Sequence, residues 1–139
     1  MSQLLAAPRL GAPLGVATVA GCACLAVWMG DPTTPGGYLP ACPTKLLLGI
    51  DCPGCGSLRM IYSVLHGDLL AALRFNAVGL IALGLLVWAY LAWTYGRMRG
   101  RRIVSWQHHR CAAMVTLVVT VVWFIIRNLP LDPFTALRV

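Results

Sequence analysis

The chain has 139 residues, of which 59% are hydrophobic and only 11% are charged, and its mean hydropathy is +0.77. Soluble domains carry about a quarter charged residues, so this composition excludes an ordinary water-soluble domain and predicts a surface that faces lipid. The net charge of +7 would suit nucleic acid. Its concentration in one short loop between apolar segments instead predicts a role in membrane topology, and we expect no nucleic-acid partner.

Three apolar runs without charged residues follow one another, at residues 14–30, 77–95 and 111–126. Each approaches the roughly 20 residues that cross a hydrocarbon core. Backbone groups in lipid must satisfy one another, so these runs should be helices. We therefore predict an all-α integral membrane protein, a single membrane domain over residues 1–139. Its three transmembrane helices lie at about residues 14–30, 77–95 and 111–128.

The basic residues predict the orientation of these spans. The short loop at residues 96–110 contains five arginines, whereas the loop at residues 31–76 is electrically neutral. Because positive loops stay in the cytoplasm, the 96–110 loop and the N-terminus should be cytoplasmic in a multi-pass protein of the cell membrane. The outer loop 31–76 and the C-terminus are then extracytoplasmic. The arginines are Arg97, Arg99, Arg101, Arg102 and Arg110.

The outer loop carries a Cys-x-x-Cys motif, Cys52-Pro53-Gly54-Cys55, and a third cysteine upstream, Cys42. Disulfides persist on the extracytoplasmic side of most membranes. Downstream of the motif, apolar residues recur at three- and four-residue steps, which predicts an amphipathic helix over about residues 57–66 that is interfacial or re-entrant. Cys55 then stands at a helix start, where the helix dipole favours thiolate.

The boundaries around this short helix have their own signals. Gly67 suits a C-terminal cap, and Asp68 suits the N-terminal cap of a long helix that runs from Leu69 into the second span. Near the N-terminus, Val19-Ala20-Gly21-Cys22 resembles a lipoprotein cleavage site. The apolar sequence after it favours an uncleaved helix, and lipidation of Cys22 stays open.

Several short motifs between Cys42 and Pro130 follow one another in a recognisable order. They are Cys42-Pro43, Cys52-Pro53-Gly54-Cys55-Gly56, Arg59, Arg74-Phe75-Asn76 and Arg127-Asn128-Leu129-Pro130. In them the chain resembles the bacterial membrane family catalogued as domain of unknown function 2752, and the resemblance implies the membrane fold rather than an activity. Leu58 and Ala77 stand where the family pattern has Thr and Pro.

Three interpretations of the cysteines remain open. The favoured one is a disulfide staple, Cys52–Cys55 or Cys42–Cys52, in a non-enzymatic accessory or structural subunit of a membrane complex. The second is a zinc-type site of Cys42, Cys52, Cys55 and His66. The third is thiol–disulfide chemistry at Cys52 and Cys55, with Cys42 as a resolving thiol. Zinc or no cofactor at all are both compatible with the sequence.

Basic and amide side chains form a further set of candidates. Arg127 and Asn128 should cap the third span. A sharper hypothesis is that Arg59, Arg74 and Arg127 gather near the thiols and bind an anionic group. We expect the lipid bilayer as a partner, and leave open other membrane subunits or a homo-oligomer. The candidates for structural or anion-binding roles are Arg59, Arg74, Asn76, Arg127 and Asn128.

Overall fold

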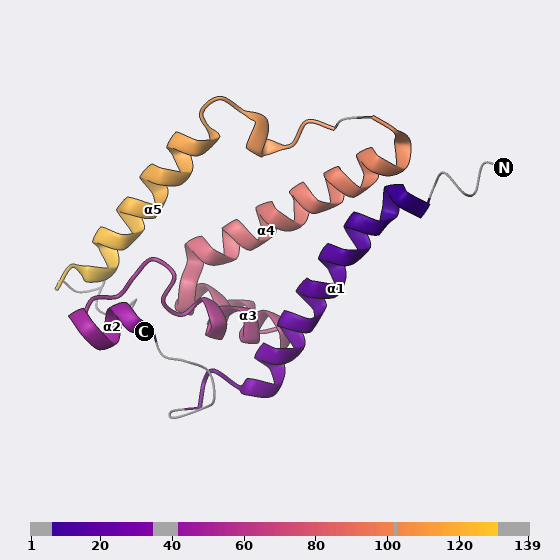
Figure 1. The fold of residues 1–139 in the computed structure, drawn as a ribbon. Helices are drawn as coiled ribbons and strands as arrows, with labels where there is room; N and C mark the ends of the chain where they lie inside the picture. Colours follow the sequence, from indigo (N-terminus) through magenta and orange to yellow (C-terminus); the bar gives the residue numbers. More distant parts are fainter. Residues whose placement is uncertain (1–6, 35–41, 102, 131–139) are drawn as a thin grey trace.

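The computed structural model describes residues 7–34, 42–101 and 103–130, and this part of the chain contains helices and no strands. The predicted all-α class is therefore confirmed. Figure 1 shows three long helices, with the short helices gathered at one end of them. In chain order the elements are α1 (Ala7–Gly30), α2 (Pro43–Leu48), α3 (Ser57–Leu65), α4 (Leu69–Arg99), the 3₁₀ turn η1 (Trp106–His108) and α5 (Ala112–Asn128).

Two helices are long and apolar enough to cross a membrane: the segment Leu10–Gly30 of α1 and all of α4. These correspond to the first two predicted spans and are consistent with a bilayer environment. The apolar helix α5 has 17 residues, fewer than the roughly 20 that usually span a membrane. Its role as a third span therefore stays a prediction.

The predicted boundary between the short and long helices is confirmed within one residue. The backbone of Gly67 has φ +78°, the left-handed conformation in which glycine ends a helix without steric cost. The Asp68 carboxylate accepts a hydrogen bond of 2.9 Å from the backbone N–H of Ala71 and so caps α4. The short helix α3 ends at Leu65, one residue before the predicted end.

A kink at Asn76 divides α4 into a short first part and a long second part. The Asn76 backbone is non-helical, with φ −162° and ψ 88°. Its side-chain oxygen accepts a 2.8 Å hydrogen bond from the N–H of Gly79, as an N-cap does. The long part therefore starts afresh at residue 77, where the sequence predicts the span to begin.

The helices are joined by few polar contacts along their length. The short helix α3 packs on α4, and α1 packs against both of them. The Tyr90 hydroxyl of α4 donates a 3.0 Å hydrogen bond to the carbonyl of Pro13 in α1. On the other side of α4, the Trp106 indole N–H donates to the Leu85 carbonyl at 3.0 Å. This second bond anchors the loop between α4 and α5 on α4.

Candidate functional site: a three-cysteine cluster

The thiols of Cys42, Cys52 and Cys55 meet in one cluster. Their sulfur atoms all lie within 4.8 Å of one another. The Sγ atom of Cys52 is central, at 3.3 Å from Cys42 and 3.1 Å from Cys55. These distances exceed the roughly 2.0 Å of a disulfide bond, and all three thiols are free in the structure. Cys55 is buried, and the other two are partly exposed.

A tight turn places Cys52 and Cys55 side by side. The N–H of Cys55 donates to the carbonyl of Cys52 at 3.0 Å, and the N–H of Cys52 donates to the sulfur of Cys55 at 3.2 Å. Gly56 ends the turn with φ +80° and forms the N-cap of α3. Only glycine adopts this left-handed conformation freely, so Gly56 is required here by its backbone.

The third cysteine comes from a separate element. Cys42 is the N-cap residue of α2, and its carbonyl accepts from the N–H of Lys45 at 3.1 Å. The Lys45 ammonium also lies 3.2 Å from the buried carboxylate of Asp51, the residue before Cys52. This ion pair holds α2 against the start of the cysteine turn and thereby keeps Cys42 beside its two partners.

The protein environment separates the acidities of two thiols in the cluster. The pKa of Cys42 is lowered to about 6, first by a hydrogen bond from the backbone of Lys45 and then by the thiols of Cys52 and Cys55. The pKa of Cys55 is raised to about 12, first by burial and then by its hydrogen bonds to the other two thiols, which is opposite to the thiolate expected for Cys55 at a helix start. The thiolate is both the metal ligand and the nucleophile of cysteine chemistry, so Cys42 presents it more readily than Cys55.

Two side chains from distant parts of the sequence bind the carbonyl groups of the turn. The Asn76 amide donates to Pro53 at 3.0 Å and to the Ser57 hydroxyl at 3.1 Å. The guanidinium of Arg127, fully buried at 0% exposure, donates to the Cys55 carbonyl at 2.6 Å and to Phe75 at 3.3 Å. Together they hold the turn between the kink of α4 and the end of α5.

Asn128 fixes the other side of the same loop. Its side-chain oxygen accepts from the N–H of Asp51 at 3.1 Å, and its amide donates to the Asp51 carbonyl at 2.9 Å. The Asn128 side chain thus forms the two hydrogen bonds that a neighbouring backbone would form, and it satisfies both the backbone N–H and the carbonyl of Asp51. The predicted role of Asn128 as a simple helix cap missed this long-range pairing.

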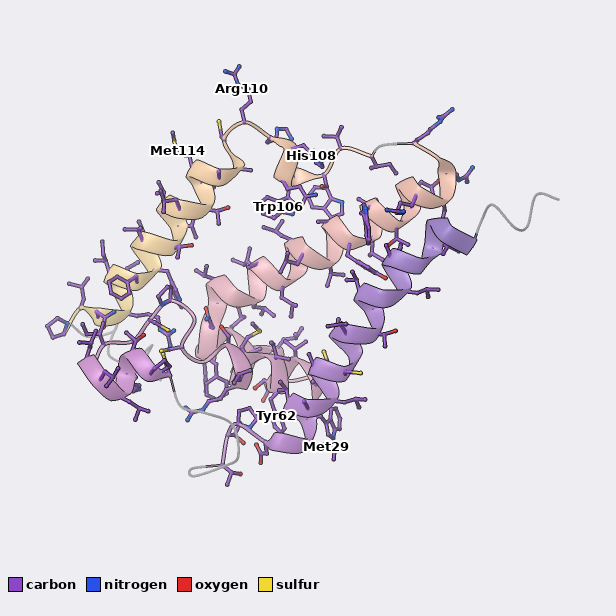
Figure 2. All side chains as sticks on the ribbon, in the orientation of Figure 1. Met29, Tyr62, Trp106, His108, Arg110 and Met114 are labelled. Carbon is purple, nitrogen blue, oxygen red and sulfur yellow. The ribbon has the colours of Figure 1, made fainter. Side chains whose placement is uncertain are left out.

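Three of the predicted candidates lie elsewhere. His66, the C-cap of α3, stacks on the Trp28 ring at 4.2 Å and is not among the residues whose ligand atoms cluster. Figure 2 shows Tyr62 of the same helix near Met29, at the end of α1. Arg59 donates to the Pro32 carbonyl at 3.0 Å, and Arg74 is exposed. Of the three arginines predicted to gather near the thiols, Arg127 donates to a carbonyl of the turn, whereas Arg59 donates to Pro32.

Sequence reasoning missed three residues that shape the site. Lys45 and Asp51 form its ion pair, but a single Lys and Asp six residues apart in a loop carry no recognisable signal. Gly79 is the second kind of omission. A Cβ built on it would lie 2.9 Å from the Asn76 side chain, so glycine is needed for that side chain to reach its place. An Asn followed three residues later by a Gly, at the start of a predicted span, is a weak sequence signal for this close contact.

One known family includes this site. Residues 42–90 match the model of a family described as "Protein of unknown function (DUF2752)". This segment of the chain is similar to that family. The match confirms the resemblance inferred from the cysteine motif, and it covers the three thiols, α3 and the kink of α4. No curated protein and no solved structure matches the chain.

Proposed function

We propose that this protein is a non-enzymatic membrane component whose outer loop is organised by a thiophilic metal ion, with Cys42, Cys52 and Cys55 as ligands. The observation that carries the proposal is the mutual approach of all three sulfur atoms within 4.8 Å. A disulfide would join only two of these thiols, whereas one metal ion binds all three. Zinc is the natural candidate, because cysteine thiolates are its common ligands in structural sites.

The geometry suits such an ion. Tetrahedral Zn–S bonds of about 2.3 Å place sulfur atoms about 3.8 Å apart, and the cluster requires only small side-chain adjustments to reach that spacing. The N–H of Cys52 already donates to the sulfur of Cys55, and such bonds stabilise a metal-bound thiolate. The low pKa of Cys42 supports deprotonation on binding, which every thiolate ligand requires.

We infer the membrane arrangement from charge and connectivity. The five arginines in residues 97–110, at the end of α4 and in the loop before α5, support a cytoplasmic loop, with the thiol cluster on the extracytoplasmic side. Figure 1 supports α5 as a third span, since it returns from that loop to the end where α2 and α3 lie. In this arrangement the ion stabilises the outer loop and, through Arg127 and Asn128, the end of α5.

Metal analysis of the full-length protein, purified without chelators, tests the proposal. We expect about one zinc-class ion per chain, and its loss in Cys42→Ser, Cys52→Ser and Cys55→Ser. Cys111→Ser, which changes an exposed cysteine at the N-cap of α5, should retain the ion. A metal-free wild type whose mass is lower by two hydrogens would contradict the proposal and assign a disulfide instead.

A second candidate function is thiol–disulfide exchange, and the central position of Cys52 favours it. Cys52 lies within bonding reach of either partner after a small rotation, so one disulfide could pass between the two pairs. Exchange needs a thiol or disulfide co-reactant. A metal-free protein in which a dithiol reagent interconverts two disulfide forms would support this candidate over the metal site.

A further inference from the structure

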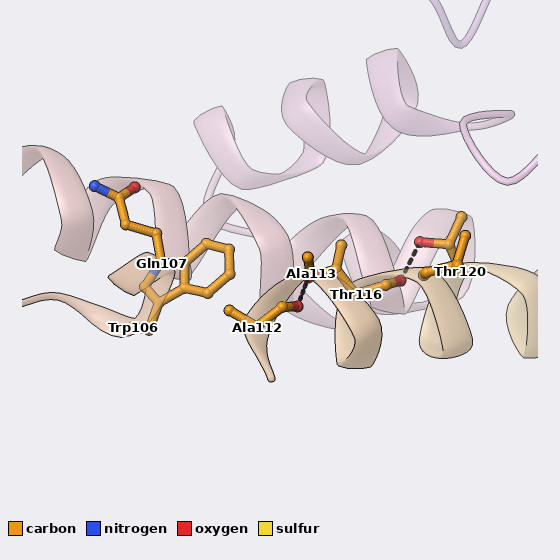
Figure 3. Close-up of a pocket in the computed structure, with 7 residues that line it drawn as sticks. Trp106, Gln107, Ala112, Ala113, Thr116 and Thr120 are labelled. Carbon is orange, nitrogen blue, oxygen red and sulfur yellow. Dashed lines mark hydrogen bonds between the residues drawn. The ribbon is translucent and has the colours of Figure 1, made fainter. Parts of the chain in front are cut away.

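A groove lies at the opposite end of the molecule from the thiols. It runs along the start of α5 below the loop and has a volume of about 480 Å³. Figure 3 shows its wall, where small side chains of α5 follow the Trp106 ring. The lining residues are Trp106, Gln107, Ala112, Ala113, Thr116, Leu117 and Thr120.

The lining of this groove is mostly apolar, although it includes Gln107 and two threonines. The Thr116 hydroxyl donates to the Ala112 carbonyl at 2.8 Å, and the Thr120 hydroxyl donates to the Thr116 carbonyl at 2.7 Å. Both threonine hydroxyls therefore donate their hydrogen within α5. Trp106 is held on α4 by its bond to Leu85, which keeps its ring in the wall between the two helices.

The mouth of the groove, at its loop end, follows a basic stretch of the sequence. No Asp or Glu occurs between residues 69 and 131, whereas residues 97–110 include five arginines, two of them in the last turn of α4. Arg110 precedes α5 by two residues, and Figure 2 shows Arg110 at the outer edge of the loop, with His108 nearer to Trp106. Basic pockets between membrane helices on the cytoplasmic side are typical sites for anionic lipid headgroups.

The length of the groove distinguishes between possible occupants. Its α5 residues extend from Ala112 to Thr120, which is about 12 Å at the helical rise per residue. A partner helix that crossed the bilayer would need contacts over about 30 Å, whereas an acyl chain occupies one leaflet of about half that thickness. The groove therefore fits a lipid chain better than a spanning helix.

We propose that this groove binds one acyl chain of an anionic phospholipid, whose phosphate lies at the loop end against Arg110. The site is independent of the thiol cluster and of any metal there. The chain packs on Ala113, Thr116 and Leu117, and the headgroup is selected by charge. The class of ligand is thus set by two separate features, an apolar groove and a basic mouth.

Native mass spectrometry of the full-length protein, after equilibration with vesicles of equal parts phosphatidylglycerol and phosphatidylcholine, tests this site. The wild type should retain one phosphatidylglycerol, with a preference of about fivefold or more for one arginine contact. Thr116→Leu fills the groove and should lose the retained lipid. Arg110→Gln should still bind lipid but lose most of the preference.

Matched controls keep the test specific. Thr18 is an exposed threonine on α1 that also donates to a backbone carbonyl four residues back, so Thr18→Leu should leave lipid binding unchanged. Arg74→Gln removes an exposed arginine far along the chain from the loop and should keep the preference. Equal lipid retention by wild type and Thr116→Leu would overturn the proposal. So would an equal affinity of the wild type for the two lipids, or a protein dimer that Thr116→Leu dissociates.

Discussion

The two ends of the long helices are held together by different means. At the cysteine end, buried polar side chains of α4 and α5 bind the turn: Asn76 and Arg127 donate to its carbonyl groups, and Asn128 pairs with Asp51. At the loop end, α5 meets α4 mainly through η1, where Trp106 bonds to Leu85 and an open groove remains. One end therefore has a specific, interlocked arrangement, and the other leaves room for lipid.

This difference shows how a small protein built of long apolar helices can acquire a defined site. In lipid, apolar contacts alone give helices little preference for one another, so small side chains and polar bonds decide how they pack. At the cysteine end these bonds converge on one turn, which then holds three thiols in register. The predictions below test how far the two ends differ.

The largest expected effect is a difference in reaction rate between two thiols of the metal-free protein. The pKa of Cys42 is lowered to about 6 and that of Cys55 is raised to about 12. Alkylation of Cys42 should therefore increase as pH rises through 6 and then level off, while Cys55 stays protonated. At pH 7 we expect a rate ratio of at least about 100. Mass mapping of iodoacetamide adducts measures it, and equal rates would show that the turn does not order the thiols.

The next effect is loss of stability on removal of the buried guanidinium. Arg127→Gln leaves the carbonyls of Cys55 and Phe75 without their charged donor and should lower the free energy of unfolding by roughly 3 kcal/mol. Metal affinity should fall as well, because the turn loosens. Thermal unfolding in detergent micelles measures the first and chelator competition the second. Arg74→Gln, at an exposed site, should change stability by less than about 0.5 kcal/mol.

Substitutions of two glycines on α4 distinguish the kink at Asn76 from the rest of the helix. Gly79→Ala places a Cβ 2.9 Å from the Asn76 side chain, so it should displace that side chain and cost about 1–3 kcal/mol. Gly84 has no atom within 4 Å of a built Cβ, and Gly84→Ala should be neutral or stabilise the helix by up to about 1 kcal/mol. Melting temperatures of the two variants should move in opposite directions. A shift of the same sign in both would exclude a special role for the Asn76 cap.

The smallest effect belongs to the loop end. Trp106→Phe removes the indole donor to Leu85 but keeps an aromatic ring in the groove wall, and should cost about 1 kcal/mol. Trp88→Phe, at a side chain that is 53% exposed, is the control and should have a smaller effect. Urea or detergent titration measures both. A loss with Trp106→Phe as large as that with Arg127→Gln would contradict the contrast between the two ends.

Local features were predictable because their causes lie within a few residues. The cap at Gly67 and Asp68 depends on one left-handed backbone and one side-chain bond to a residue three positions on. The predicted start of the second span, at residue 77, coincides with the Asn76 kink. The sequence alone also made His66 a weak candidate for a metal ligand beside the cysteines. An α-helical rise over ten residues places it about 15 Å from the cysteine turn.

The sequence by itself determined the helical class, the positions of the long apolar helices and the caps around α3, since hydropathy and local hydrogen bonds act over short distances. It also located the thiols beside a helix start. Only the tertiary structure decided that Cys42 joins Cys52 and Cys55, and that Arg127 and Asn128 bind the same loop across 72 and 77 residues of sequence. Such contacts depend on where separate helices end relative to one another, and no local pattern in the chain encodes that.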